Sequence, residues 1–165
     1  MVIIGFSGSR RLSVRYALLA QGIAHTCVKA GYKINVGCAN GLDAFIREAV
    51  PSAKVFSVKS GFYGAGKSAY VKRSIDLIKS SNILIGFVNE PCPSGIIPAD
   101  RWTSGIVPSG TWSSLALAVG LNIPVYIFCC SSDKIVLPRW SGKWKRVISG
   151  ILKDSLKFFK NDLPF

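Results

Sequence analysis

The sequence has little of the chemistry on which most catalytic and metal sites depend. It contains one histidine, His25, and eight acidic residues against 21 lysines and arginines. Its five cysteines form an odd set without a C-x-x-C pair, which predicts neither a disulfide framework nor a zinc site. We therefore expect reduced thiols, no metal site and no required cofactor.

Long hydrophobic runs are also missing. The longest apolar stretches, at 83–88 and 124–130, are too short to cross a bilayer. The first residues lack the basic start and apolar core of a signal peptide, so we predict a cytoplasmic protein without stable membrane association. A chain of 165 residues with 49% hydrophobic and 18% charged residues suits one globular domain spanning 1–165.

The excess of basic residues gives a formal net charge of +13. Such a charge favours anionic partners, among them nucleic acids, nucleotides, phosphorylated ligands and anionic membrane surfaces. A basic bias shared by the whole proteome is the alternative explanation. The composition leaves the oligomeric state open, with a homo-oligomer among the options.

Short apolar runs alternate with amphipathic stretches along most of the chain. The pattern predicts strands at 2–6, 33–36, 54–58, 83–88 and 124–129, and helices at 12–30, 42–50, 68–80 and 111–119. This alternation indicates a Rossmann-like, doubly wound α/β fold, with a mostly parallel sheet in the order 3-2-1-4-5 and helices on both faces. We predict a long loop at 89–109, which holds four prolines, and a basic amphipathic C-terminal helix at 143–160.

Three glycine-containing turns follow predicted strands or open a predicted helix. Their residues are Gly8, Ser9 and Arg10, then Gly37, Asn40, Gly41 and Asp43, then Ser109, Gly110 and Thr111. Singly, each turn is typical of a tight strand–helix connection. Together they predict a phosphate site, because ligands of open parallel sheets bind beyond the carboxyl ends of the strands and helix N-termini offer free N–H groups. Arg10 would add a bidentate cation.

At these turns the sequence resembles the Rossmann domain of DNA-processing protein A (DprA/Smf) and the wider SLOG superfamily, which includes the LOG phosphoribohydrolases. The resemblance covers most of residues 2–128 through Gly-Phe-Ser-Gly-Ser-Arg, Asn-Val-Gly-Cys-Ala-Asn-Gly-Leu-Asp and Ser-Gly-Thr-Trp-Ser-Ser. It implies a nucleotide or nucleic-acid site at those same turns. Arg47 stands where DprA has a histidine, and Asn40 where DprA usually has an arginine. Ser114 takes the place of the catalytic glutamate of LOG enzymes, so the resemblance implies binding more than a reaction.

A competing motif runs from Gly61 to Ser68 and matches the P-loop pattern G-x-x-x-x-G-K-[ST] between a predicted strand and a predicted helix. P-loop enzymes also need a strand that ends in a magnesium-binding carboxylate, and 83–88 is followed by Asn89-Glu90, a poor substitute. The other interpretation is a flexible loop from which Lys67 and Arg73 meet an anionic ligand.

Two further side chains, Arg101 and Trp112, are candidates to contact a base or phosphate, although a tryptophan that anchors the long loop by packing is the more common arrangement. The first function hypothesis is therefore the binding of a nucleotide or nucleotide-derived phosphorylated ligand at the carboxyl ends of the strands, without catalysis. The alternatives are a DprA-like protein that binds single-stranded DNA and a P-loop NTPase.

Overall fold

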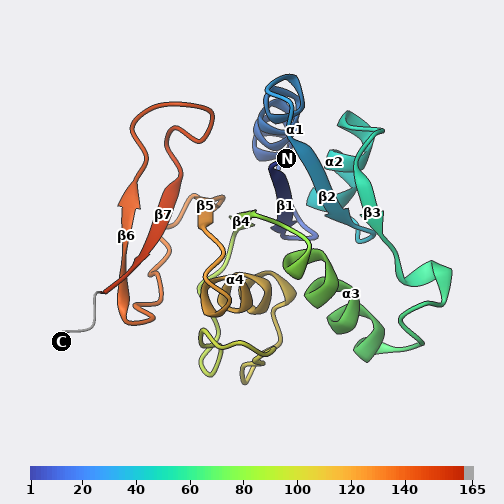
Figure 1. The fold of residues 1–165 in the computed structure, drawn as a ribbon. Helices are drawn as coiled ribbons and strands as arrows, with labels where there is room; N and C mark the ends of the chain where they lie inside the picture. The colour runs from blue at the N-terminus through green and yellow to red at the C-terminus, as the bar shows by residue number, and fades with distance from the viewer. Residues whose placement is uncertain (162–165) are drawn as a thin grey trace.

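The chain forms alternating strands and helices, followed by a C-terminal hairpin (Figure 1). The computed structural model describes residues 1–161. In chain order the elements are β1 (Ile3–Gly8), α1 (Val14–Lys29), β2 (Lys33–Gly37), α2 (Leu42–Ala49), β3 (Lys54–Phe56), the short 3-10 helix η1 (Val58–Ser60), α3 (Lys67–Lys79), β4 (Ile83–Val88), α4 (Gly110–Gly120), β5 (Val125–Cys129), β6 (Gly142–Arg146) and β7 (Leu156–Lys160).

All seven strands belong to one sheet in the order β3-β2-β1-β4-β5-β7-β6. The first five are parallel, and the order predicted for them is confirmed. The hairpin β6–β7 extends the sheet beyond β5 with antiparallel pairing. The Rossmann-like doubly wound fold is therefore confirmed, with two strands that the sequence pattern did not predict.

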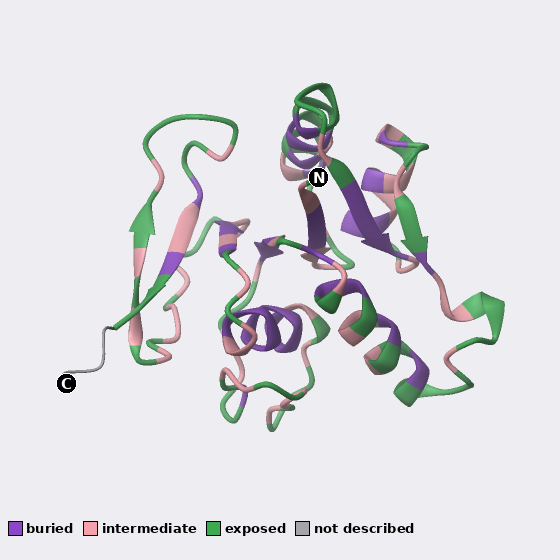
Figure 2. Ribbon diagram, viewed as in Figure 1, coloured by how far each residue is buried: buried purple, intermediate pink, exposed green. Residues whose placement is uncertain are grey.

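Helices cover both faces of the sheet, and each face has its own core (Figure 2). In β4, Ile85 and Phe87 pack with α1 and α2, whereas Leu84 and Val88 pack with α3 and α4. A strand buried on both faces reads as a continuous apolar run, which explains why its bounds were predicted without error. Within residues 1–161, no helix combines the length and the apolar character needed to cross a membrane.

The predicted helix at 143–160 is wrong, because β6 and β7 occupy this segment. The strands are registered so that Trp144 lies opposite Phe158, and both rings pack against the core beside α4. The apolar residues at 147–152 have helical spacing but lie in the connection between the strands. There Gly150 (φ 84°) and Asp154 (φ 70°) adopt left-handed conformations that an α-helix does not contain.

The predicted loop at 89–109 contains no helix or strand, but it is fastened to α4. The indole Nε1 of Trp112 donates a hydrogen bond to the carbonyl of Glu90 (2.8 Å), and the hydroxyl of Ser113 donates to the carbonyl of Thr103 (2.7 Å). Gly120 lies so close to the backbone of Ala99 that a Cβ atom at Gly120 would overlap it. The loop is therefore held at both ends of the helix.

Candidate functional site

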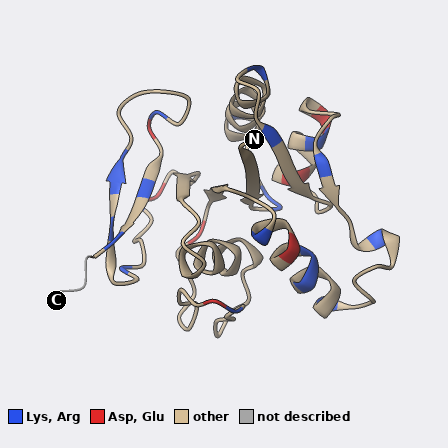
Figure 3. Cartoon of the chain, in the orientation of Figure 1, with Lys and Arg blue, Asp and Glu red and all other residues tan. Residues whose placement is uncertain are grey.

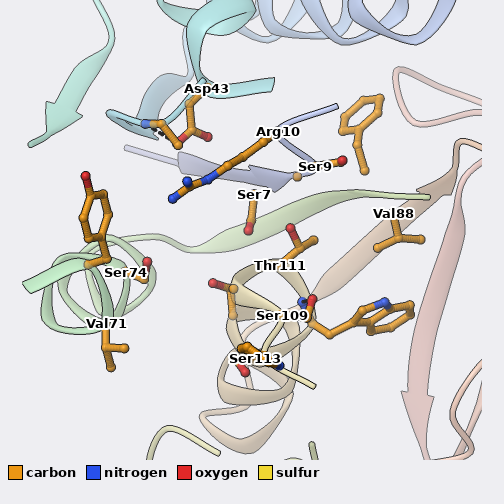
Figure 4. Close-up of a pocket in the computed structure, with 18 of the residues that line it drawn as sticks. Ser7, Ser9, Arg10, Asp43, Val71, Ser74, Val88, Ser109, Thr111 and Ser113 are labelled. Atoms are coloured by element: carbon orange, nitrogen blue, oxygen red, sulfur yellow. Dashed lines mark hydrogen bonds between the residues drawn. The ribbon is translucent and has the colours of Figure 1, made fainter. Parts of the chain in front are cut away.

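A cavity of about 780 Å³ lies beyond the carboxyl ends of β1 and β4, between α3 and α4 (Figure 4). Its walls come from the end of β1, the start of the 89–109 loop, one side of α3 and the first turn of α4. These two strands are adjacent in the sheet although distant in the sequence, and the chain leaves them in opposite directions. Ligands of open α/β sheets bind at such a switch point, and the volume is typical of small-molecule sites.

Arg10 enters the cavity from the turn after β1 (Figure 4). This turn is fixed by a hydrogen bond from the Ser9 N–H to the Phe87 carbonyl (3.2 Å). Gly41 has a φ of 73° and packs directly on the backbone of Ser9 and Arg10, where a Cβ would collide. The guanidinium carbon of Arg10 lies 5.8 Å from the centroid of the Tyr70 ring, which also lines the cavity.

The first turn of α4 forms the opposite wall. Ser109 is the N-cap residue, and its hydroxyl accepts a hydrogen bond from the N–H of Trp112 (3.2 Å). The N–H groups of Gly110 and Thr111 precede the first intrahelical hydrogen bond and so have no partner within the helix. With the positive end of the helix dipole, they suit an anion such as a phosphate.

Behind these groups lies a buried charge cluster. Asp43, in the first turn of α2, accepts a hydrogen bond from the Ala39 N–H (3.2 Å), and its carboxylate is 3.5 Å from the guanidinium of Arg73. Each side chain of this ion pair is 9% exposed. Arg47 donates to the carbonyls of Gly37 (2.8 Å) and Ala39 (2.9 Å) and thereby braces the turn.

Burial raises the pKa of the Asp43 carboxyl, and the nearby guanidiniums of Arg73 and Arg47 offset this only in part. The Nε of Arg73 is buried without a hydrogen-bond partner among residues 1–161. Its guanidinium carbon lies 5.8 Å from the Tyr70 ring, so that Tyr70 is flanked by Arg73 and Arg10. The basic side chains that line the cavity outnumber its two carboxylates, Asp43 and Glu90, so its wall has a net positive charge.

Among the hydroxyl groups that line the cavity, those of Ser7, Ser74 and Thr111 are three that make no hydrogen bond within residues 1–161. Figure 4 shows all three side chains around the space between β1, α3 and α4. The hydroxyl of Ser9, by contrast, accepts hydrogen bonds from the Arg11 N–H (3.0 Å) and the Asn89 side chain (2.8 Å). Ser9 therefore holds the wall together, whereas the other three have hydrogen-bonding capacity to spare.

The structure brings most of the predicted site residues to this cavity. Those that line it are Gly8, Ser9, Arg10, Asp43, Ser109, Gly110, Thr111, Lys67, Arg73 and Trp112, and those that do not are Gly37, Asn40, Gly41 and Arg101. Gly37 makes room for the Arg73 guanidinium, as Gly41 does for the Arg10 backbone. Arg101 is on the surface, with its side chain 82% exposed. Trp112 is buried and tied to the loop, which agrees with the anchoring interpretation.

Sequence reasoning found Lys67 and Arg73 of α3 but missed two other side chains that this helix supplies. Tyr70 and Ser74 lie one helical turn apart and face the cavity together with Lys67, one turn earlier. The spacing from Lys67 was the signal that could have found them. The glycines at 61, 64 and 66 do not line the cavity, so the P-loop-like segment contributes only Lys67, the first residue of α3.

The cavity holds few groups for general acid–base or nucleophilic chemistry. Its carboxylates are Asp43 and Glu90, and His25 lies elsewhere, with its ring nitrogen 2.7 Å from the carbonyl of Ala49. Ser114, which the sequence resemblance aligns with the LOG glutamate, is buried in α4 where that helix lines the cavity. Within the described residues, histidine, cysteine and carboxylate side chains form no group of three that could hold a metal ion.

The sheet order defines a Rossmann-like α/β protein, and its cavity lies at the switch point beyond the strand carboxyl ends. Among solved structures, the chain is similar to DNA processing protein A from Helicobacter pylori, with a TM-score of 0.58 at 18% sequence identity. The similarity covers 76% of this chain and 64% of that protein, which binds single-stranded DNA. The fold is therefore DprA-like. No protein-family model matches the chain, and no curated protein matches its sequence.

Proposed function

We propose that the cavity binds a nucleotide or a nucleotide-derived phosphorylated ligand. The observation that carries this proposal is the convergence of Arg10, the first turn of α4 and the hydrogen-bonding capacity of Ser7, Ser74 and Thr111 on one cavity of about 780 Å³. The phosphate would lie against the N–H groups of α4 and the guanidinium of Arg10.

The remainder of the ligand would occupy the space between α3 and α4. Hydroxyls such as those of Ser7 and Ser74 suit a ribose, which offers both donors and acceptors. Val71, Leu77 and Val88 give this space an apolar lining that suits a planar base. The proposal includes the relationship to the SLOG superfamily that the glycine turns suggest. It also includes binding without catalysis, because Ser114 lacks the carboxyl group of a LOG enzyme.

The test compares adenosine 5′-monophosphate with adenosine by isothermal titration calorimetry. We expect the phosphate-bearing compound to bind more tightly, and Arg10→Ala to weaken its binding by about 1.5–3 kcal/mol, the range for a hydrogen bond to a charged group. Arg101→Ala is the matched control, because it removes the same charge outside the cavity. Equal affinities for nucleotide and nucleoside, or equal effects of the two variants, would contradict the proposal.

Single-stranded DNA bound at the same cavity is the second candidate, favoured by the likeness to the Helicobacter pylori protein. Salt dependence separates the two. A strand that contacts several phosphate sites loses affinity steeply with added salt, whereas a mononucleotide with one phosphate site shows a shallow slope. The P-loop hypothesis has less support, since only Lys67 of its motif reaches the cavity. Magnesium-dependent ATP hydrolysis that disappears in Lys67→Ala would restore it.

A further inference from the structure

The C-terminal hairpin carries a second surface in which lysines alternate with aromatic rings. We call it the hairpin face and define it by Tyr126, Lys143, Lys145, Lys157 and Phe159. The pairing register places Tyr126, Lys157 and Lys145 side by side across β5, β7 and β6, with Phe159 and Lys143 opposite each other in the next row. Alternate residues of a strand share a face, so all five side chains lie on one side of the sheet.

This side of the hairpin is open. Phe128, two residues after Tyr126, packs with the α1–α2 core, which shows which side of the sheet the hairpin face occupies. However, α1 and α2 pack against β1 and β2, and the five residues belong to neither core cluster. Phe159 is 41% exposed. Figure 3 shows the basic residues on β6 and β7, well separated from those of α3.

The lysines of the hairpin face are in electrostatic conflict. Lys145 and Lys157 stand directly opposite each other, an arrangement in which like charges destabilise a sheet. Both ammonium groups lie over the Phe159 ring, at 5.2 and 5.0 Å from its centroid, and that of Lys157 also lies 5.4 Å from the Tyr126 ring. Among residues 1–161, none of the three lysines forms an ion pair.

Protection of the sheet edge does not account for this pattern. Lysines on an edge strand discourage pairing with other chains, which would explain Lys143 and Lys145 on β6. Lys157, however, is on β7, which is paired on both sides. Edge protection also gives no reason for an exposed aromatic ring such as that of Phe159. The cation–π contacts offset the repulsion between the two ammonium groups only in part, because no carboxylate pairs with either lysine among residues 1–161. A local conflict of this kind is typical of a functional surface.

We propose that the hairpin face binds single-stranded nucleic acid. Bases stack on Phe159 and Tyr126, and phosphates neutralise Lys143, Lys145 and Lys157, relieving the repulsion between the opposed ammonium groups. A polyanion matches the charge of the surface, and unpaired bases match the exposed Phe159 and the half-buried Tyr126 beside it. None of the five residues lines the large cavity, so this surface is independent of the nucleotide site proposed above.

The test measures the binding of a fluorescent oligothymidine of about 16 nucleotides by anisotropy at several salt concentrations. Phe159→Leu should weaken binding about ten-fold, through the loss of one stacked base. Lys145→Ala should reduce the slope of log K against log salt by about 0.7, the contribution of one phosphate contact in a single strand. Lys79→Ala is the matched control, because it removes the same charge from the end of α3 on the other side of the sheet.

Circular dichroism of each variant checks folding, and Arg10→Ala separates the two sites. The proposal predicts normal oligonucleotide binding in Arg10→Ala and Lys79→Ala, with weakened binding in Phe159→Leu and Lys145→Ala. Binding that is lost only in Arg10→Ala would assign the strand to the cavity and overturn the proposal. Equal affinity for duplex DNA without an effect of Phe159→Leu, or binding to phosphatidylserine vesicles without binding to the oligonucleotide, would overturn it as well.

Discussion

Replacing glycine by alanine should have opposite effects on stability in α1 and in α4, because Gly120 of α4 contacts the 89–109 loop. Gly22, in the middle of α1, is exposed, and a Cβ atom there would meet nothing within 4 Å. Gly22→Ala should therefore stabilise the protein by about 0.5–1 kcal/mol, the usual difference between the two residues in a helix. At Gly120 the same Cβ would overlap the carbonyl carbon, carbonyl oxygen and amide nitrogen of Ala99.

The overlapping atoms at Gly120 are backbone atoms, so no side-chain rotation removes the clash. Overpacking of this kind costs about 1–3 kcal/mol, which exceeds the gain in helix propensity. Since both variants share the gain in helix propensity, we expect Gly120→Ala to be less stable than Gly22→Ala by the overpacking cost, about 1–3 kcal/mol. With about 2–4 °C per kcal/mol for a chain of this size, its Tm should be lower by roughly 2–12 °C.

Urea unfolding followed by circular dichroism and by tryptophan fluorescence measures both variants. Circular dichroism reports the helices, and the fluorescence signal includes Trp102 and Trp112, which lie in the loop and under it. If Gly120→Ala proved as stable as Gly22→Ala, the loop would not be docked on the end of α4. The contact at Gly120 would then not hold the cavity wall in place.

Three further outcomes follow from the site. Lys67→Ala should weaken nucleotide binding by about 1 kcal/mol or less, as titration calorimetry can measure, because a lysine in the exposed first turn of α3 adds only screened charge. The pKa of Asp43 is raised in the folded protein, so its contribution to stability is present below the unfolded pKa of about 4 and is lost as pH rises through the folded value. Urea unfolding across this range should therefore show the wild type losing stability relative to Asp43→Asn, and parallel pH profiles would disprove the burial argument. Trp112→Phe removes the donor to the Glu90 carbonyl and should lower the free energy of unfolding by about 1–3 kcal/mol, in contrast to a control substitution at exposed Phe62.

The parallel part of the fold could be predicted because its signals are local and strong. A strand such as β4 is apolar throughout since both of its faces are covered, and the adjoining helices are bounded by glycines and polar turns. The hairpin could not be predicted in this way. Its connection at 147–155 contains apolar residues with helical spacing, and the left-handed conformations of Gly150 and Asp154 within it are not foretold by that spacing.

The residues of the candidate site were likewise predictable where a local motif marks them and unpredictable where tertiary packing places them. The turns at Arg10 and at Ser109 to Thr111 were predicted because short motifs after strands determine where such residues lie. Tyr70 and Ser74 were missed, because their spacing from Lys67 points to the cavity only once tertiary packing has placed Lys67 there. The buried ion pair between Asp43 and Arg73 joins α2 to α3, and residue spacing alone does not reveal a contact between two separate helices.

The aromatic contacts between α4 and the hairpin have a spectroscopic consequence. The rings of Trp112 and Trp140 meet edge to face at 5.7 Å, and Trp140 in turn contacts Trp144 at 6.0 Å and Phe158 at 6.1 Å. Indoles held this close in an asymmetric arrangement couple their electronic transitions and give a distinct near-ultraviolet circular dichroism band. Because Trp112 belongs to the helix that walls the cavity and Trp144 to β6, this band is an intrinsic optical marker of hairpin docking that needs no label. A hairpin that swung away from the rest of the sheet would extinguish the band while leaving the helical signal in the far ultraviolet almost unchanged.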